Sequence, residues 1–135
     1  MTLTGGCLCG GVRFELSEPP GRATYCHCTR CQRRSGTAAS AEGRIEADTL
    51  TVLSGEDLVR AYAPVDGWHE LFCSKCASAL FSRNPEDRSR MSVGLGAFDG
   101  DPGVRPSRRQ FVAYAAVWEP LPDDGLPRYD AGRPR

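Results

Sequence analysis

The amino-acid sequence predicts a single, mainly β domain over residues 1–135, and three observations support this prediction. Short apolar stretches alternate with polar residues at the period of two that half-buried strands show. Gly, Pro and Asp residues stand between these stretches, as they do in the turns of all-β domains. No segment has the 3.6-residue period of a long amphipathic helix, and the length suits one domain.

The first elements can be justified residue by residue. Val12, Phe14 and Leu16 alternate with polar residues and indicate a strand, which the Pro-Pro-Gly segment 19–21 ends. Residues 29–35 are polar and are followed by Gly36, which indicates a short helical turn. Further strands are expected at 23–25, 50–53, 58–63, 68–72, 79–81, 91–95 and 111–118. We expect a surface loop at 100–106 and a loosely held tail after about residue 129.

Seven cysteines fall into three tight groups: Cys7 and Cys9, then Cys26, Cys28 and Cys31, then Cys73 and Cys76. Thiolates this close in a turn can reach one metal ion at about 2.3 Å. A disulfide framework is disfavoured, because the number is odd and the start of the chain lacks the apolar region of a signal peptide. A cytoplasmic location, which we expect, would keep the thiols reduced. Thiolate-rich sites favour zinc, and the spacings of ferredoxin clusters are absent.

The cysteines can be divided between two metal sites. The triplet Cys26, Cys28 and Cys31 can close on one metal by itself, whereas the two separated pairs can each supply half of a tetrahedron. The simplest partition is therefore a closed four-cysteine site and an open three-cysteine site. Structural zinc sites are closed and catalytic ones keep a free position. Spacing alone leaves a second partition open, in which the first pair joins two members of the triplet.

Several segments resemble a known family. They are Gly6–Phe14 (GCLCGGVRF), Cys26–Arg33 (CHCTRCQR), Phe72–Cys76 (FCSKC), the run Phe111–Trp118 and Asp124–Tyr129 (DGLPRY). In this order they are similar to the glutathione-dependent formaldehyde-activating enzymes, a family that includes the centromere-protein-V-like proteins. The resemblance covers nearly the whole chain.

The resemblance implies a β-rich zinc fold of the β-tent, Mss-four-like type. It also implies a structural zinc on Cys7, Cys9, Cys73 and Cys76, and a labile or catalytic zinc on Cys26, Cys28 and Cys31. The implied activity is that of a carbon–sulfur lyase, which combines glutathione with formaldehyde to S-hydroxymethylglutathione.

Two residues depart from the family pattern. The family usually has Gly after the last cysteine, where this chain has Ala77; an Ala in a left-handed conformation costs about 1 kcal/mol. The family often has His at the start of its late strand, where this chain has Arg109. The pattern alone does not decide whether Arg109 is compatible with activity.

The composition of the triplet favours thiol chemistry. Three thiolates leave a zinc ion with a net charge near −1, which weakens it as an activator of water but suits a further thiol. In the alternative, His27 or His69 supplies a fourth ligand and makes this a second structural site. The binding partner we expect is a small-molecule thiol such as glutathione.

Arginines flank the triplet. Arg30 and Arg33 are the candidates for holding the carboxylates of glutathione, since a guanidinium can bind a carboxylate through two hydrogen bonds. Arg34 stands in the same segment. The chain is rich in Arg, with Lys75 its single lysine, so solvated surface arginines are the competing explanation.

Charge excludes some classes of partner. The sequence has 17 basic and 17 acidic residues and a formal net charge of zero, which gives no electrostatic basis for binding nucleic acid or an acidic membrane. No apolar run has the length of a transmembrane helix. The oligomeric state is not predicted. Besides the enzyme, a zinc-stabilised binding module without catalysis remains as a second hypothesis.

Overall fold

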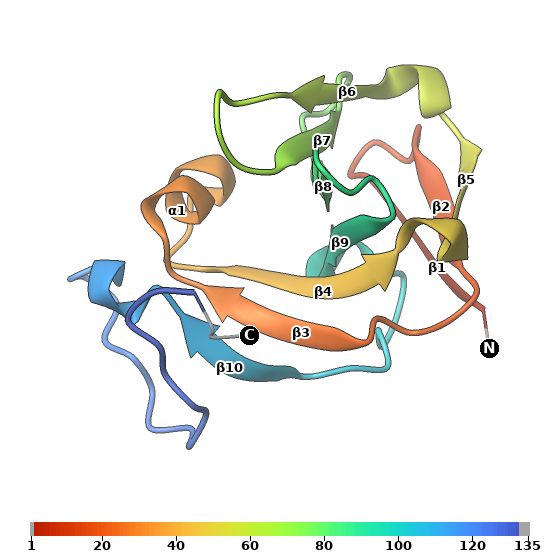
Figure 1. The fold of residues 1–135 in the computed structure, drawn as a ribbon. Helices are drawn as coiled ribbons and strands as arrows, with labels where there is room; N and C mark the ends of the chain where they lie inside the picture. Colours follow the sequence, from red (N-terminus) through yellow and green to blue (C-terminus); the bar gives the residue numbers. More distant parts are fainter. Residues whose placement is uncertain (1, 133–135) are drawn as a thin grey trace.

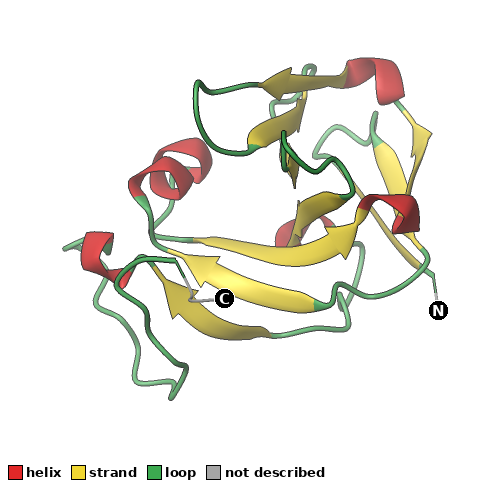
Figure 2. Cartoon of the chain, in the orientation of Figure 1, coloured by secondary structure: helices red, strands yellow, loops and turns green. Residues whose placement is uncertain are grey.

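The computed structural model describes residues 2–132 and shows a mainly β architecture with short helices at its margins (Figures 1 and 2), which confirms the predicted fold class. The strands are β1 (Leu3–Gly6), β2 (Arg13–Leu16), β3 (Arg22–Cys26), β4 (Ser40–Glu46), β5 (Leu50–Ser54), β6 (Val59–Tyr62), β7 (His69–Cys73), β8 (Ala79–Arg83), β9 (Arg90–Gly94) and β10 (Pro106–Gln110). The helices are α1 (Thr29–Ser35) and the 3₁₀ turns η1 (Ala47–Thr49), η2 (Glu56–Leu58), η3 (Leu95–Ala97) and η4 (Val112–Tyr114).

A three-stranded sheet of order β1-β2-β5 holds the first cysteine pair. β1 and β2 pair antiparallel, so the cysteines lie in the turn that connects them. Phe14 on β2 is fully buried, and its ring packs edge-on against Phe81 and Phe98, with centroids 5.2 and 5.8 Å away. Because Phe81 belongs to β8, this aromatic contact joins the small sheet to the larger one.

The larger sheet has the order β10-β3-β4-β9-β8-β7-β6. β10 runs parallel to β3, and every other neighbouring pair in this order is antiparallel. Buried side chains of its strands meet those of β2 in one core: Ile45, Leu71, Leu80, Phe81, Met91 and Val93. Cys26 ends β3 and Cys73 ends β7, so regular backbone pairing fixes the start of the second cysteine group and the start of the third.

The polar segment after Cys28 forms helix α1, as predicted. Cys28 is its N-cap, because the Cys28 Sγ accepts a hydrogen bond from Cys31 N at 3.3 Å. Gly36 follows the helix with φ of 68°, the left-handed conformation that ends many helices. α1 lies beside the connection from β6 to β7 (Figure 1), where the Arg30 side chain donates to Asp66. The triplet therefore faces the segment that precedes β7.

The strand predicted at 111–118 is wrong. The late strand is β10, which ends at Gln110, and Phe111 then takes the left-handed conformation with φ of 58°. The 3₁₀ turn η4 follows, and Val117 and Trp118 are exposed. This apolar run therefore forms a loop and not a strand, because the edge of β3 is already paired with β10.

The segment after this loop returns to β10. Arg109 N donates to Pro127 O and Tyr129 N donates to Arg109 O, both at 2.9 Å. Phe111 N donates to Ala131 O at 3.0 Å. The chain is thus hydrogen-bonded to β10 and its end as far as Ala131; residues 133–135 of the predicted loose tail lie outside the described residues.

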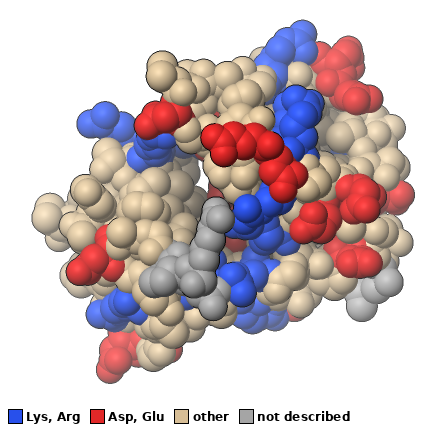
Figure 3. Space-filling model, viewed as in Figure 1, with Lys and Arg blue, Asp and Glu red and all other residues tan. Residues whose placement is uncertain are grey.

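Charged side chains of both signs are intermingled on the face shown in Figure 3. Arg105 and Asp101 form an exposed ion pair with 2.6 Å between Nη2 and Oδ2. Over residues 2–132, the structure contains no helix with the length and apolar character needed to cross a bilayer.

Ala77 occupies a backbone conformation that favours glycine. Its φ is 64°, and its N–H donates to Cys73 O at 2.7 Å to close the turn of the last cysteine pair. We therefore expect Ala77→Gly to stabilise the protein by up to about 1 kcal/mol, because it removes the steric conflict of a Cβ in this region. Thermal denaturation measures the gain. Ala61→Gly, within β6, is the control and should destabilise by about 0.5–1 kcal/mol; equal effects would contradict the account of the turn.

Candidate functional site

The two separated cysteine pairs meet in space. The Sγ atoms of Cys7, Cys9, Cys73 and Cys76 all lie within 4.8 Å of one another. Cys7 Sγ and Cys9 Sγ are 3.5 Å apart, and Cys9 Sγ and Cys73 Sγ are 3.9 Å apart. Thiolates bound tetrahedrally at about 2.3 Å from one zinc ion would be about 3.8 Å apart, whereas a disulfide needs about 2.05 Å. The spacing therefore fits four ligands of one metal ion.

The pKa values of Cys7 and Cys76 are lowered in this group, whereas the Cys7 thiol raises the pKa of Cys9 to about 11 despite a hydrogen bond from Gly11 N. Val12 N lies 3.2 Å from Cys7 Sγ and donates to it, and Gly11 N donates to Cys9 Sγ at 3.4 Å. A hydrogen bond with Ser78, whose Oγ is 3.2 Å from Cys76 Sγ, lowers the pKa of the Cys76 thiol to about 5. Since metals bind the thiolate and not the thiol, these donors suit a metal site.

The triplet forms a second group at the junction of β3 and α1. The Sγ atoms of Cys26, Cys28 and Cys31 lie within 4.8 Å of one another. Hydrogen bonds from the other two thiols, and then from the backbone N–H groups at the start of α1, lower the pKa of Cys28. Within residues 2–132, no histidine, carboxylate or further cysteine joins these three sulfurs at that distance.

A buried hydroxyl stands beside the triplet. Ser40 begins β4 and lies opposite Cys26 in the register of β3 and β4. Its Oγ is buried and makes no hydrogen bond to the described part of the chain. A buried hydroxyl opposite Cys26 can donate to a neighbouring thiolate, so the donor set and its surroundings fit a group of metal-bound thiolates. The sequence gives no signal for Ser40, because its position depends on the pairing of β3 with β4.

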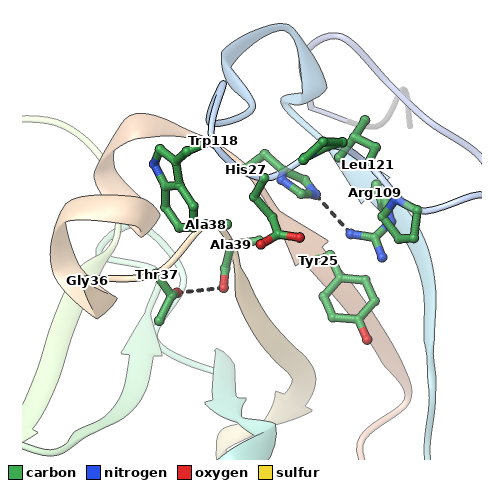
Figure 4. Close-up of a pocket in the computed structure, with 12 residues that line it drawn as sticks. Tyr25, His27, Gly36, Thr37, Ala38, Ala39, Arg109, Trp118 and Leu121 are labelled. Carbon is green, nitrogen blue, oxygen red and sulfur yellow. Dashed lines mark hydrogen bonds between the residues drawn. The ribbon is translucent and has the colours of Figure 1, made fainter.

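His27 faces away from the cysteines on either side of it. Its ring is buried and its Nε2 is 3.2 Å from Arg109 Nη1 (Figure 4). Burial and the charge of Arg109 lower the pKa of His27. Arg109 in turn donates through Nε and Nη2 to Asp124 Oδ2, at 3.1 and 2.8 Å, and lies over the Tyr25 ring at 4.3 Å. Arg109 on β10 therefore holds His27 in place. Tyr25, His27 and Arg109 line a separate cavity of about 520 Å³.

The triplet opens into another cavity, of about 630 Å³. Cys28 and Cys31 contribute to its wall, together with aromatic side chains from β6, β7 and the segment between them, Tyr62, Trp68 and Phe72. A thiol-bearing molecule in this cavity would have its sulfur close to the triplet and apolar surface along its length.

Three arginines line this cavity in different states. Arg30 Nη2 is 2.6 Å from Asp66 Oδ1 in an exposed ion pair. Arg34 is half-buried and pairs with Glu42, at 3.4 Å, and with Glu70. Arg33 is exposed and makes no ion pair or hydrogen bond to residues 2–132. Of the two sequence-predicted carboxylate binders, Arg33 is thus available as it stands, whereas Arg30 already has a carboxylate partner.

Comparison with known proteins agrees with these features. The sequence profile of the glutathione-dependent formaldehyde-activating enzymes matches residues 2–114. A curated protein of Halomonas elongata that carries the same family name is 34% identical over 114 residues, which is 80% of this chain and 73% of that protein. The crystal structure of a Rhodobacter sphaeroides protein has a similar fold, with a TM-score of 0.59 at 19% identity over 93% of this chain and 98% of that one. The chain therefore belongs to the glutathione-dependent formaldehyde-activating enzyme family.

Proposed function

We propose that this protein is a zinc-dependent carbon–sulfur lyase that combines glutathione with formaldehyde to give S-hydroxymethylglutathione. Family membership supports the substrates. The observation that supports the reaction site is the triplet of cysteine sulfurs within 4.8 Å of one another, two of whose residues line a cavity of about 630 Å³.

The proposal assigns two zinc ions to each chain. Cys7, Cys9, Cys73 and Cys76 would hold a structural ion, because four sulfurs within 4.8 Å of one another can supply all four ligands of a tetrahedral site. This site would join the turn between β1 and β2 to the end of β7. Cys26, Cys28 and Cys31 would hold the second ion. When bound there, zinc supplies a soft positive centre that favours the ionised form of a further thiol.

The chain's own residues would orient the thiol. Tyr62, Trp68 and Phe72 offer apolar surface to the ligand, and exposed Arg33 offers a free guanidinium to one of its carboxylates. Arg30 is the weaker candidate, because a ligand carboxylate would have to displace Asp66 from it. This arrangement suits a peptide-like thiol with carboxylates at some distance from its sulfur.

The direct test is the exchange between formaldehyde and S-hydroxymethylglutathione. The reaction is facile without an enzyme, so the measured quantity is the excess of the exchange rate over the spontaneous rate, obtained by magnetization-exchange NMR at equilibrium. We expect an excess that is proportional to the concentration of zinc-loaded protein. Absence of any excess with both sites loaded would overturn the enzymatic proposal and favour a zinc-stabilised binding module.

A further inference from the structure

A carboxylate lies in the wall of the triplet cavity. Glu70 stands on β7, and its side chain, 29% exposed, lines the same cavity as Cys28 and Cys31. Among the described residues that line this cavity, which include aromatic, basic, cysteine, proline and alanine side chains, Glu70 is the one carboxylate. Its hydrogen bonds show what it can do there.

One oxygen of Glu70 is held and the other is free. Ser82 Oγ donates to Glu70 Oε2 at 2.7 Å, and the Arg34 guanidinium pairs with the same oxygen. Oε1 makes no hydrogen bond to residues 2–132. It is also absent from the buried unpaired atoms of these residues, so it is accessible from the cavity or solvent. The carboxylate is thus fixed in orientation while Oε1 remains open as an acceptor.

Arg34 connects Glu70 to the helix that carries the triplet. Arg34 stands three residues after Cys31 on α1, and residues at this spacing share one side of a helix. Its Nη2 donates to Leu71 O at 3.3 Å and to Phe81 O at 3.2 Å, so β7 and β8 fix the guanidinium. The carboxylate therefore faces the side of α1 on which Cys31 lies.

A second carboxylate shares the same guanidinium but not the cavity. Glu42 Oε1 is 3.4 Å from Arg34 Nη1, and Ser92 Oγ donates to Glu42 Oε2 at 3.2 Å. Burial raises the pKa of Glu42. Glu42 therefore shares the Arg34 guanidinium with Glu70 but does not line the triplet cavity.

We propose that Glu70 is a catalytic residue that accepts the proton of the substrate thiol and returns it to the product; this inference rests on the proposed function. As the proton leaves sulfur for Glu70 Oε1, the sulfur electron pair forms the S–C bond to the carbonyl carbon. The π pair of the C=O bond moves to oxygen, which takes the proton back from Glu70. The carboxylate is regenerated, and the sum is a thiol plus an aldehyde giving a hemithioacetal.

The test compares two isosteric variants of the same network. Glu70→Gln should lower the excess exchange rate by about 100-fold, since a positioned proton acceptor contributes about 10²–10⁴-fold. Glu42→Gln removes a carboxylate from the same guanidinium but does not line the cavity, so its rate should stay close to that of the native protein. Thermal denaturation and glutathione titration of each variant separate loss of rate from loss of fold or of binding.

Chemical rescue provides the second readout. In Glu70→Ala, added formate should restore part of the excess rate, because a small carboxylate can occupy the space of the lost side chain and accept the proton. A purely structural role of Glu70 would give no such recovery. Native rate in Glu70→Gln, or equal losses in Glu70→Gln and Glu42→Gln, would overturn the role of Glu70 while the proposed function stands. No excess rate in the native protein would remove both.

Discussion

Cys73→Ser is expected to prevent stable folding. Cys73 is fully buried at the end of β7, and its sulfur lies 3.9 Å from Cys9 Sγ in the turn after β1. Loss of this ligand would open the four-cysteine site that joins the two sheets. Structural zinc contributes on the order of 10 kcal/mol to folding, which is comparable with the whole stability of a typical domain, about 5–15 kcal/mol. Circular dichroism should therefore show no cooperative thermal transition.

Cys28→Ser is the matched control for this prediction. It also removes one sulfur ligand, but from a group contained within residues 26–31 that joins no distant segments. Cys28 is the N-cap of α1, and serine is among the best N-cap residues, so the hydrogen bond from Cys31 N is preserved by the new hydroxyl. The variant should keep a cooperative transition. Equal loss of stability in Cys73→Ser and Cys28→Ser would refute the division into a structural and a reactive site.

Glutathione binding is expected to fall steeply in Cys28→Ser. If the sulfur of glutathione is held at the triplet, removal of one of the three thiolates weakens the binding of the metal ion that would hold this sulfur. We expect a loss of affinity of roughly tenfold or more, which corresponds to about 1.4 kcal/mol. Titration calorimetry with zinc-loaded protein measures this. Unchanged affinity in this variant would place the ligand elsewhere.

Much of the fold was predictable from the sequence because its signals are local. The alternation of Val12, Phe14 and Leu16 predicted β2, and the polar segment before Gly36 predicted α1. The two groups of cysteines that come together in space are those of the simplest partition, although spacing alone left a second partition open. For β2, α1 and the triplet the deciding information lies within a few residues of chain, as turn chemistry and side-chain periodicity require.

The rest depends on contacts between distant parts of the chain. Tyr25 pairs with Arg109 across β3 and β10, and no local pattern announces a parallel pair of this separation. The apolar run after Gln110 therefore suggested a strand where the structure has a loop. Glu70 and Ser40 were missed for the same reason, since each is an ordinary polar residue until the sheet places it beside the triplet.

The role of Arg109 also emerges only from the fold. The sequence shows an arginine where relatives often have histidine, and this invites the question of a lost catalytic group. In the structure, Arg109 is buried between Tyr25, His27 and Asp124. It contacts His27 in the triplet segment and lines the cavity of about 520 Å³, not the triplet cavity. Its contacts with these neighbours are those of a structural residue.

The measurement that tests the central claim most directly compares glutathione with S-methylglutathione. The two ligands share their carboxylates, amino group and peptide backbone, and differ only in whether the sulfur can be ionised. If the triplet of Cys26, Cys28 and Cys31 holds the ligand through its sulfur, calorimetric titration of the zinc-loaded protein should give glutathione a higher affinity by roughly tenfold or more. Equal affinities for the two ligands would contradict a thiol-binding centre at the triplet.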